Sequence, residues 1–284
     1  MGSPRSRRAR GAVLAVLGAC AMMVGCRHDE GAARAVAERG REDAAGPSGE
    51  TKADGDAGSK VVEPARVDRF RVPGDVVASV VRSTSGAAPT TVFLPGICSN
   101  AYAYLLAFPE AARRQGGVVA VEGDQPCGNL EGFRSFSWDA NKLHARIEAA
   151  IAAAGLAVVP REGLTLVGYS QGAALGEQLV QRWPARYARV VLIGAPTDPS
   201  AARFAEARAV VTMSCARDVP WKMKEATARF VKAGIPSTYV EMPGCTHGNI
   251  TDGDRTFDAA FDWLRANARP IKDEAKPQPL VGDG

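Results

Sequence analysis

The fold is decided by residues 164–176, which read Leu-Thr-Leu-Val-Gly-Tyr-Ser-Gln-Gly-Ala-Ala-Leu-Gly. The first six residues suit a buried strand, and a helical pattern begins directly after the serine. The motif G-x-S-x-G, centred on Ser170, lies at the junction. A serine in a sharp turn between a strand and a helix projects its hydroxyl above the sheet edge, and glycines two residues before and after it relieve the crowding. The stretch therefore predicts a serine nucleophile in front of a helix N-terminus, where the helix dipole favours negative charge.

Alternating elements are predicted on both sides of this stretch. Strands are expected over residues 67–72, 76–81, 90–94, 117–121, 164–169, 188–193, 209–213 and 238–242. Helices are expected over residues 102–114 and 138–154, after Ser170, and after each of the last two strands. Pro73 and Gly74 join the first two strands and predict an antiparallel start. The alternation that follows is typical of an α/β fold, with a mostly parallel central sheet of about eight strands and helices on both faces.

The sequence Gly-Tyr-Ser-Gln-Gly-Ala at residues 168–173 resembles the nucleophile elbow of the α/β-hydrolase superfamily. The resemblance extends from about residue 67 to residue 269. Carboxylesterases, dienelactone-hydrolase-like enzymes and cutinases all have motifs of this form. The resemblance implies an α/β-hydrolase fold and serine hydrolase activity. Only a short segment, residues 194–208, lies where this fold commonly carries a lid, so no large lid is expected.

A serine nucleophile needs a base that takes its proton, and the chain has three histidines. His28 lies in a polar N-terminal segment. His144 lies on a predicted helix between two cationic residues, so it is expected on the surface. His247 lies in the loop after the last predicted strand, where hydrolases of this fold place the base. We therefore expect His247 to be the base.

The third catalytic group is an acid that holds the imidazole in the required tautomer, and in this fold it lies between the serine and the histidine in the chain. Asp218 and Asp198 each follow a predicted strand in this interval. Residues 215–220, Cys-Ala-Arg-Asp-Val-Pro, resemble the G-x-x-D-x-V-x-P region of many esterases, with Cys215 in place of the glycine. The resemblance favours Asp218 and leaves Asp198 as the alternative. Asp218 as the N-cap of the next helix is the purely structural interpretation.

Two backbone N–H groups are expected to bind the oxyanion of the tetrahedral intermediate. One is the N–H of Gln171, the residue after the serine. Residues 93–97, Phe-Leu-Pro-Gly-Ile, resemble the His-Gly-x loop of the superfamily with Pro95 in place of the histidine. This resemblance indicates the N–H of Ile97 as the second donor. A simple turn at the end of a strand is the alternative interpretation of the loop.

The N-terminus resembles the signal peptide of a bacterial lipoprotein. A basic segment with four arginines and no acidic residue precedes an apolar run over residues 11–24. Met-Val-Gly-Cys, ending at Cys26, resembles a lipobox, which predicts a signal peptide over residues 1–26 and a lipidated Cys26. Cys20 is the alternative lipidation site, and a plain cleaved signal or a retained short anchor is the alternative to lipidation. Because neither cysteine has an adjacent aspartate, we expect an exported protein of the cell envelope, anchored in the outer membrane.

Polar segments flank the predicted domain, which covers residues 65–270. Residues 27–64 contain almost no large apolar side chain and are expected to form a disordered tether, and residues 271–284 a disordered tail. The four N-terminal arginines account for the whole formal net charge of +4, so the mature protein gives no indication of nucleic-acid binding. The sequence has neither a phosphate-binding glycine loop after a strand nor a C-x-x-C pair, so no cofactor and no metal are expected.

Four cysteines lie within the predicted domain: Cys98, Cys127, Cys215 and Cys245. An even number of cysteines in an exported protein indicates disulfides, and four cysteines allow three pairings. In the fold that the resemblance implies, the first two follow neighbouring strands, and so do the last two. We therefore expect the disulfides Cys98–Cys127 and Cys215–Cys245.

These observations predict a serine hydrolase that cleaves a small-molecule or polymeric carboxylic ester through an acyl-enzyme intermediate, with Ser170, Asp218 and His247 as its triad. A serine peptidase or an acyltransferase with the same triad is one alternative, and a catalytically silent binding lipoprotein on this scaffold is another. The aromatic residues of the predicted loop 124–138 are expected either to wall the substrate site or to belong to the core. Arg134 in that loop is expected in solvent, with contact to an anionic substrate group as the alternative.

Overall fold

The computed structural model describes residues 63–271. The predicted signal peptide, both candidate lipidation sites (Cys20 and Cys26), almost all of the predicted tether and the tail from residue 272 lie outside the described residues. Within the described range, no helix combines the length and the hydrophobicity needed to span a bilayer.

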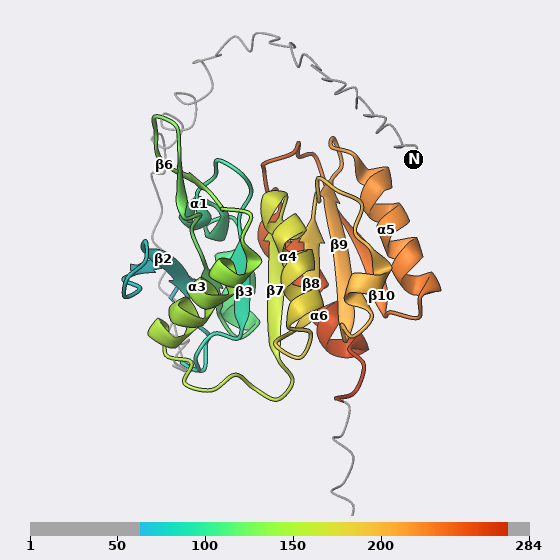
Figure 1. Ribbon diagram of the computed structural model, residues 1–284, viewed down its shortest axis with the longest axis horizontal. Coiled ribbons are helices and arrows are strands. Elements are labelled where there is room, and N and C mark those ends of the chain that lie inside the picture. Colours follow the sequence, from blue (N-terminus) through green and yellow to red (C-terminus); the bar gives the residue numbers. More distant parts are fainter. Residues whose placement is uncertain (1–62, 272–284) are drawn as a thin grey trace, which may run out of the picture. The chain divides into compact units, whose positions relative to one another are not determined.

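An eight-stranded sheet forms the centre of the described residues (Figure 1). Its strands are β1 (Asp68–Phe70), β2 (Ala78–Val81), β3 (Thr91–Leu94), β4 (Val118–Ala120), β7 (Leu164–Tyr169), β8 (Tyr187–Ile193), β9 (Ala209–Cys215) and β10 (Ser237–Met242). Their order across the sheet is β1-β2-β4-β3-β7-β8-β9-β10. In this sheet β2 pairs antiparallel with β1 and β4, and every other pair is parallel. The predicted sheet, including its antiparallel start, is confirmed.

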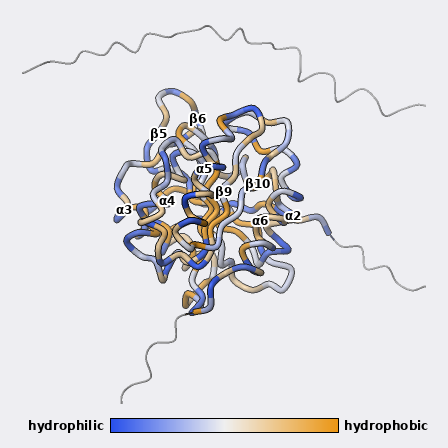
Figure 2. Tube along the Cα trace, turned by 90° about the vertical axis from the view of Figure 1, so that its right-hand side faces the viewer, coloured by the Kyte–Doolittle hydropathy of each residue, from blue (hydrophilic) through white to orange (hydrophobic). Residues whose placement is uncertain are grey.

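Helices cover both faces of the sheet, as predicted (Figure 1). They are α1 (Ala101–Leu105), α2 (Pro109–Arg114), α3 (Ala140–Ala153), α4 (Gln171–Arg182), α5 (Pro220–Lys232) and α6 (Gly253–Asn267). The core on one face contains Leu175 of α4, Phe230 of α5 and side chains of α3. In the core on the other face, Phe108, just before α2, stacks on Phe257 of α6 with ring centroids 3.8 Å apart. Figure 2 shows the hydrophobic residues concentrated in the interior, along the strands. The burial of apolar side chains on both faces is the main stabilising contribution to this fold.

The single helix predicted over residues 102–114 is wrong: the segment forms α1 and α2. Phe108 separates the two helices with φ −146° and ψ 46°, and Pro109 is the first residue of α2. The ring of a proline excludes the residue before it from helical geometry, so the first helix must end before Phe108. A proline at the first helical position is tolerated because its missing N–H would have no partner there.

The loop predicted over residues 124–138 contains a β-hairpin, β5 (Gln125–Cys127) and β6 (Leu130–Ser135), which forms a second, two-stranded sheet. The hydrophobic residues of this segment divide between the two roles that the sequence leaves open. Phe136 is buried in the core, whereas Leu130, Phe133 and Trp138 are exposed. The expectation that Arg134 lies in solvent is corrected, because its guanidinium donates to the carbonyls of residues 123 and 124, at 2.5 and 3.1 Å.

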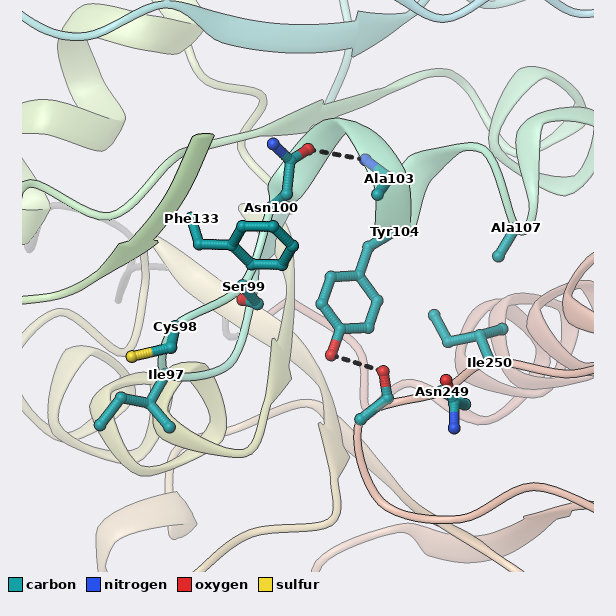
Figure 3. Close-up of a pocket in the computed structure, with 11 residues that line it drawn as sticks. Ile97, Cys98, Ser99, Asn100, Ala103, Tyr104, Ala107, Phe133, Asn249 and Ile250 are labelled. Carbon is teal, nitrogen blue, oxygen red and sulfur yellow. Dashed lines mark hydrogen bonds between the residues drawn. The ribbon is translucent and has the colours of Figure 1, made fainter. Parts of the chain in front are cut away.

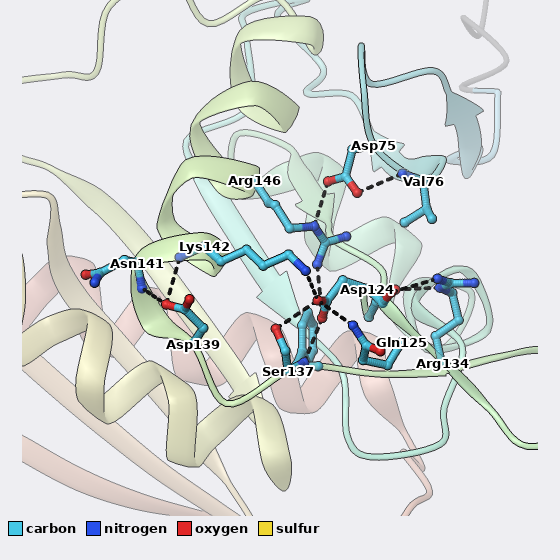
Figure 4. Close-up of polar contacts among 12 residues, drawn as sticks. Asp75, Val76, Asp124, Gln125, Arg134, Ser137, Asp139, Asn141, Lys142 and Arg146 are labelled. Carbon is cyan, nitrogen blue, oxygen red and sulfur yellow. Dashed lines mark hydrogen bonds and ion pairs between the residues drawn. The ribbon is translucent and has the colours of Figure 1, made fainter.

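A charge cluster around the carboxylate of Asp124, whose side chain is 8% exposed, fixes the base of this hairpin against α3 (Figure 4). Asp124 accepts hydrogen bonds from the N–H and hydroxyl of Ser137, at 2.7 and 2.8 Å, and from Nζ of Lys142 at 2.6 Å. Burial alone would raise the pKa of Asp124, but these hydrogen bonds hold that pKa well below its usual range. On the same helix Arg146 is buried and pairs with Asp75 at 2.7 Å. This face of α3 is therefore partly buried although it carries charged side chains.

Candidate active site

Ser170 lies in a strained turn between β7 and α4. Its backbone has φ 50° and ψ −112°, in the left-handed half of conformational space that residues with a side chain rarely adopt. Gly168 makes the turn possible, because a Cβ at this position would lie 2.4 Å from the carbonyl oxygen of Gly172, and Gly172 lets the start of α4 lie against the end of β3, where a Cβ would be 2.2 Å from the carbonyl oxygen of Leu94. Such strain persists only where the surrounding structure imposes it, and it is typical of functional positions. The sequence predicts this turn, and the structure places Ser170 at the carboxyl end of a central strand.

The side chains of Ser170, His247 and Asp218 form a continuous hydrogen-bonded row. Nε2 of His247 lies 3.0 Å from Oγ of Ser170, and Nδ1 lies 2.7 Å from Oδ2 of Asp218. A carboxylate accepts the proton of Nδ1–H, which leaves Nε2 as an acceptor for the serine hydroxyl. Ser170 is buried, whereas the side chain of His247 is 44% exposed and reaches the serine from the solvent side. The row can therefore move a proton away from the serine hydroxyl.

The acid in this row is Asp218, which follows β9, and not Asp198. Asp198 lies on the exposed segment after β8. The N-cap of α5 is Val219, so Asp218 is not the N-cap of this helix. The carboxylate of Asp218 is instead directed at the imidazole of His247.

His144 is not the surface residue that the sequence predicts. Its ring is half-buried and stacks on Trp183, with centroids 3.9 Å apart. Its Nδ1 is 2.7 Å from the hydroxyl of Tyr187. Burial lowers the pKa of His144, with a smaller opposing effect of Glu148. His144 therefore connects α3 to the region of α4 and β8, and has no contact with Ser170.

The two expected oxyanion donors flank Ser170. The loop after β3 lies against the serine, because a Cβ on Gly96 would be 3.3 Å from Cβ of Ser170. The N–H of Gly172 donates to the carbonyl of Pro95 at 3.1 Å and joins this loop to α4. Between residues 63 and 271, the N–H groups of Ile97 and Gln171 have no hydrogen-bond acceptor. The role of both N–H groups as oxyanion donors stays a prediction.

Two disulfides reinforce the segments around the row, and they are the pairs expected from the sequence. Cys98 and Cys127, whose Cα atoms are 5.3 Å apart, join the loop of Ile97 to the hairpin. Cys215 and Cys245, with Cα atoms 5.0 Å apart, join the carboxyl ends of β9 and β10. The second disulfide thereby connects the segments that carry Asp218 and His247.

Gly194 is part of the site but is not predicted from the sequence. It follows β8 with φ +52°, and a Cβ there would lie 3.1 Å from Cε1 of His247 and 3.3 Å from Oδ2 of Asp218. A side chain here would press on both the histidine and the carboxylate. A glycine directly after a strand, one strand before the candidate acid, is the signal that could have indicated it.

A cleft of about 400 Å³ opens beside the row (Figure 3). Its lining residues are Ile97, Cys98, Ser99, Asn100, Ala103, Tyr104, Ala107, Phe133, Gly248, Asn249 and Ile250. The cleft thus extends from the loop of the Ile97 N–H to the residues directly after His247. Most of the side chains that line it are apolar, with two amides among them, which suits an apolar group attached to a polar one. Within residues 63–271, no three His, Cys, Asp or Glu side chains are placed to hold a metal ion.

Comparisons with known proteins identify structural neighbours. No protein-family model and no curated protein matches the chain. A carboxyl esterase from the fungus Tuber melanosporum has a TM-score of 0.53 at 12% identity, and the match covers 74% of this chain and 89% of the esterase. A protein from Thermoplasma acidophilum described as a predicted CIB-like hydrolase has a TM-score of 0.52 at 15% identity, and the match covers 71% of this chain and 98% of that protein. A substrate-bound, fluorophosphonate-binding serine hydrolase from Staphylococcus aureus has a TM-score of 0.52 at 10% identity, covering 71% and 99%. At these identities the similarity establishes a shared fold.

Proposed function

The chain has the α/β-hydrolase fold, and on this premise we propose that it is a serine hydrolase that cleaves carboxylic esters through an acyl-enzyme intermediate. The observation that carries the proposal is the row of Ser170, His247 and Asp218, with its two distances of 3.0 and 2.7 Å. These are the distances that nucleophile activation by a histidine requires. The strained turn at Ser170 and the two unpaired N–H groups beside it add the other parts of such a site.

In the first half of the proposed reaction, Oγ of Ser170 attacks the carbonyl carbon of the ester, and Nε2 of His247 takes the hydroxyl proton. The tetrahedral intermediate carries an oxyanion, which the N–H groups of Ile97 and Gln171 bind. When the intermediate collapses, the bond to the alkoxy group breaks, and His247 gives its proton to the departing alcohol. The acyl group remains on Ser170 as an ester.

In the second half, water replaces the alcohol. His247 takes a proton from the water, whose oxygen attacks the acyl carbon, and returns it to Oγ of Ser170 as the carboxylic acid leaves. The sum is one ester and one water converted to one acid and one alcohol. Asp218 keeps its negative charge throughout and stabilises the imidazolium in both halves. Each oxyanion donor contributes about 3 to 4 kcal/mol of transition-state stabilisation in enzymes of this kind.

The cleft beside His247 is the proposed place for the apolar part of the ester. It is bordered by the loop of Ile97, which supplies an oxyanion donor, so a group in the cleft lies next to the reacting carbonyl. The segment between β8 and β9, residues 194–208, holds only the short 3-10 turn Ala201–Phe204 (η1). None of these residues lines the cleft, and we expect the enzyme to act on dissolved esters without an opening step.

The test is turnover of matched substrates by the wild-type domain and by Ser170→Ala. We expect hydrolysis of an acyl ester, with a loss of at least about a thousandfold in Ser170→Ala. The corresponding amide and an added alcohol acceptor distinguish the alternatives. Faster cleavage of the amide indicates a peptidase, and faster transfer to the alcohol than to water indicates an acyltransferase. A folded wild-type domain with no turnover of any acyl substrate contradicts the proposal and favours a binding protein.

The proposed cellular context is a lipoprotein of the cell envelope, anchored through Cys26. It is supported by the basic segment and the apolar run that precede Cys26 in the sequence. Metabolic labelling with a fatty-acid probe tests it in the full-length chain. Label that persists in Cys20→Ser and disappears in Cys26→Ser supports this site, and the reverse result moves the anchor to Cys20.

A further inference from the structure

Two tyrosine hydroxyls bind the backbone of Gly248, the residue after His247. The N–H of Gly248 donates to the hydroxyl of Tyr169 at 2.7 Å. The hydroxyl of Tyr104 donates to the carbonyl of Gly248 at 2.9 Å (Figure 3). Tyr169 is the last residue of β7 and directly precedes Ser170, and Tyr104 belongs to α1. Both polar groups of one residue in the histidine loop are thus held by distant parts of the chain.

The tyrosines are themselves firmly placed. Tyr169 is 1% exposed, and Tyr104 packs against it with ring centroids 5.1 Å apart. Tyr104 also packs against Phe93 of β3 at 5.6 Å. Burial raises the pKa of Tyr169 to about 12, so this hydroxyl stays protonated over the whole range in which an imidazole can act as a base. Burial also raises the pKa of Tyr104. Both hydroxyls therefore keep their hydrogen bonds at every relevant pH.

The loop that carries His247 is also attached before the histidine, where the carbonyl of Cys245 accepts from the N–H of Arg217 at 3.0 Å and the carbonyl of Pro243 accepts from the hydroxyl of Thr251. In residues 243–249 only Cys245 is buried, and it is held by its disulfide to Cys215. The disulfide restrains the loop two residues before His247, and the tyrosine hydroxyls restrain it one residue after. The ring of Tyr169 also meets the imidazole edge-on, at 5.5 Å between centroids. The tyrosine hydroxyls thus bind the backbone of the two residues on the carboxyl side of His247.

We propose that Tyr169 and Tyr104 are positioning residues that hold the imidazole of His247 between Ser170 and Asp218. The inference rests on the proposed function of His247 as the base. It assigns to Tyr169, the variable residue between the glycine and the serine of the motif, a role beyond packing. It also couples the cleft to the catalytic row, because Tyr104 both lines the cleft and holds the loop.

The kinetic test compares Tyr169→Phe and Tyr104→Phe with the control Tyr187→Phe, which removes a buried hydroxyl bonded to His144 instead. Each of the first two variants keeps its ring. Tyr104→Phe loses the bond to the carbonyl of Gly248, and Tyr169→Phe loses the bond from the N–H of Gly248 and a longer one, 3.4 Å, to the carbonyl of Asn249. We expect kcat to fall about tenfold in each variant, with little change in KM. The double variant is expected to lose more than either single one. Tyr187→Phe is expected to keep the wild-type kcat, although it loses a comparable amount of stability. If Tyr169→Phe does not fold, Tyr104→Phe carries the test.

A spectroscopic test needs no turnover. The Nδ1 proton of His247, bonded to Asp218, is expected to give a far-downfield proton resonance in the wild type and in Tyr187→Phe. In Tyr169→Phe and Tyr104→Phe the imidazole moves more freely, so this resonance should broaden or disappear. An unchanged resonance with unchanged kcat in both variants overturns the inference. An inactive wild type that shows the resonance and its loss in the variants supports the positioning and contradicts the proposed function alone.

Discussion

Substitution of Gly194 by alanine tests whether the meeting of His247 and Asp218 depends on an empty space beside them. The new methyl carbon would lie 3.1 Å from Cε1 and 3.2 Å from Nδ1 of His247, and 3.3 Å from Oδ2 of Asp218. Ordinary contacts of a methyl carbon begin at about 3.4 Å. The imidazole and the carboxylate must therefore move apart from the methyl group by a few tenths of an ångström.

The magnitude follows from two separate costs. A residue with a side chain in the left-handed region loses about 1 to 2 kcal/mol of stability, and Gly194 has φ +52°. Misplacement of a catalytic group by about 1 Å lowers activity roughly a hundredfold, so a shift of a few tenths should lower kcat roughly three- to tenfold. The matched control is Gly234→Ala, at a glycine with φ +74° after α5 and no atom within 4 Å of the added carbon.

The assay combines ester hydrolysis with urea unfolding of both variants. We expect a similar loss of stability in Gly194→Ala and Gly234→Ala, but a lower kcat only in Gly194→Ala. If Gly194→Ala keeps the wild-type kcat, the close packing around His247 and Asp218 is not needed for activity, and the reasoning is refuted. If Gly234→Ala loses as much activity, the effect belongs to backbone strain in general.

Three further predictions concern the parts around the row. Replacement of both Cys215 and Cys245 by serine opens a closed loop of 30 residues and should lower the free energy of unfolding in urea by about 3 to 4 kcal/mol. The same variant should have a lower kcat. An unchanged kcat would show that the disulfide does not hold the site. Asp124→Asn should cost about 1 to 2 kcal/mol at pH 7, because hydrogen bonds to the charged carboxylate are weakened while Lys142, which is half exposed, stays hydrated. Because the pKa of Asp124 lies below its usual 3.8 in the folded state, this stabilisation is present above about pH 4 and lost below it, so urea unfolding at pH 3 should show a smaller difference. Burial lowers the pKa of His144 below its usual 6.5, so the unfolded chain takes up the proton first as the pH falls. The stability that depends on neutral His144 is therefore complete above about pH 6.5 and is lost below it. Unfolding curves at pH 5.5 and 7.5 should show a smaller loss of stability in His144→Gln than in the wild type.

The parts predicted well from the sequence are those with strong local signals. The turn at Ser170 needs small residues at 168 and 172, and the alternation of strands and helices implies a parallel sheet. His247 could be chosen because the chain has only three histidines, and one of them follows the last strand. The cysteine pairs follow once the order of the strands is assumed, since each pair joins the ends of neighbouring strands.

The parts not predicted depend on contacts between distant residues. The bonds of Tyr169 and Tyr104 to Gly248 join residues 79 and 144 positions apart, and no local pattern indicates them. The hairpin β5–β6 depends on a disulfide to Cys98 and on the charge cluster at its base, as well as on a local signal, the two-residue turn Gly128-Asn129 with Gly128 at φ 55°. The break at Phe108 is different, because Pro109 was a local signal that the apolar pattern of residues 102–114 outweighed.

The most direct test of the central claim is intact-mass labelling of the purified soluble domain with a fluorophosphonate, beside Ser170→Ala and His247→Ala. The reagent forms a stable bond only with a serine whose hydroxyl is activated. We expect a single adduct on the wild type, located at Ser170 by peptide mapping, and no adduct on either variant. A folded wild-type domain that remains unlabelled, or an adduct that persists in Ser170→Ala, would contradict the account.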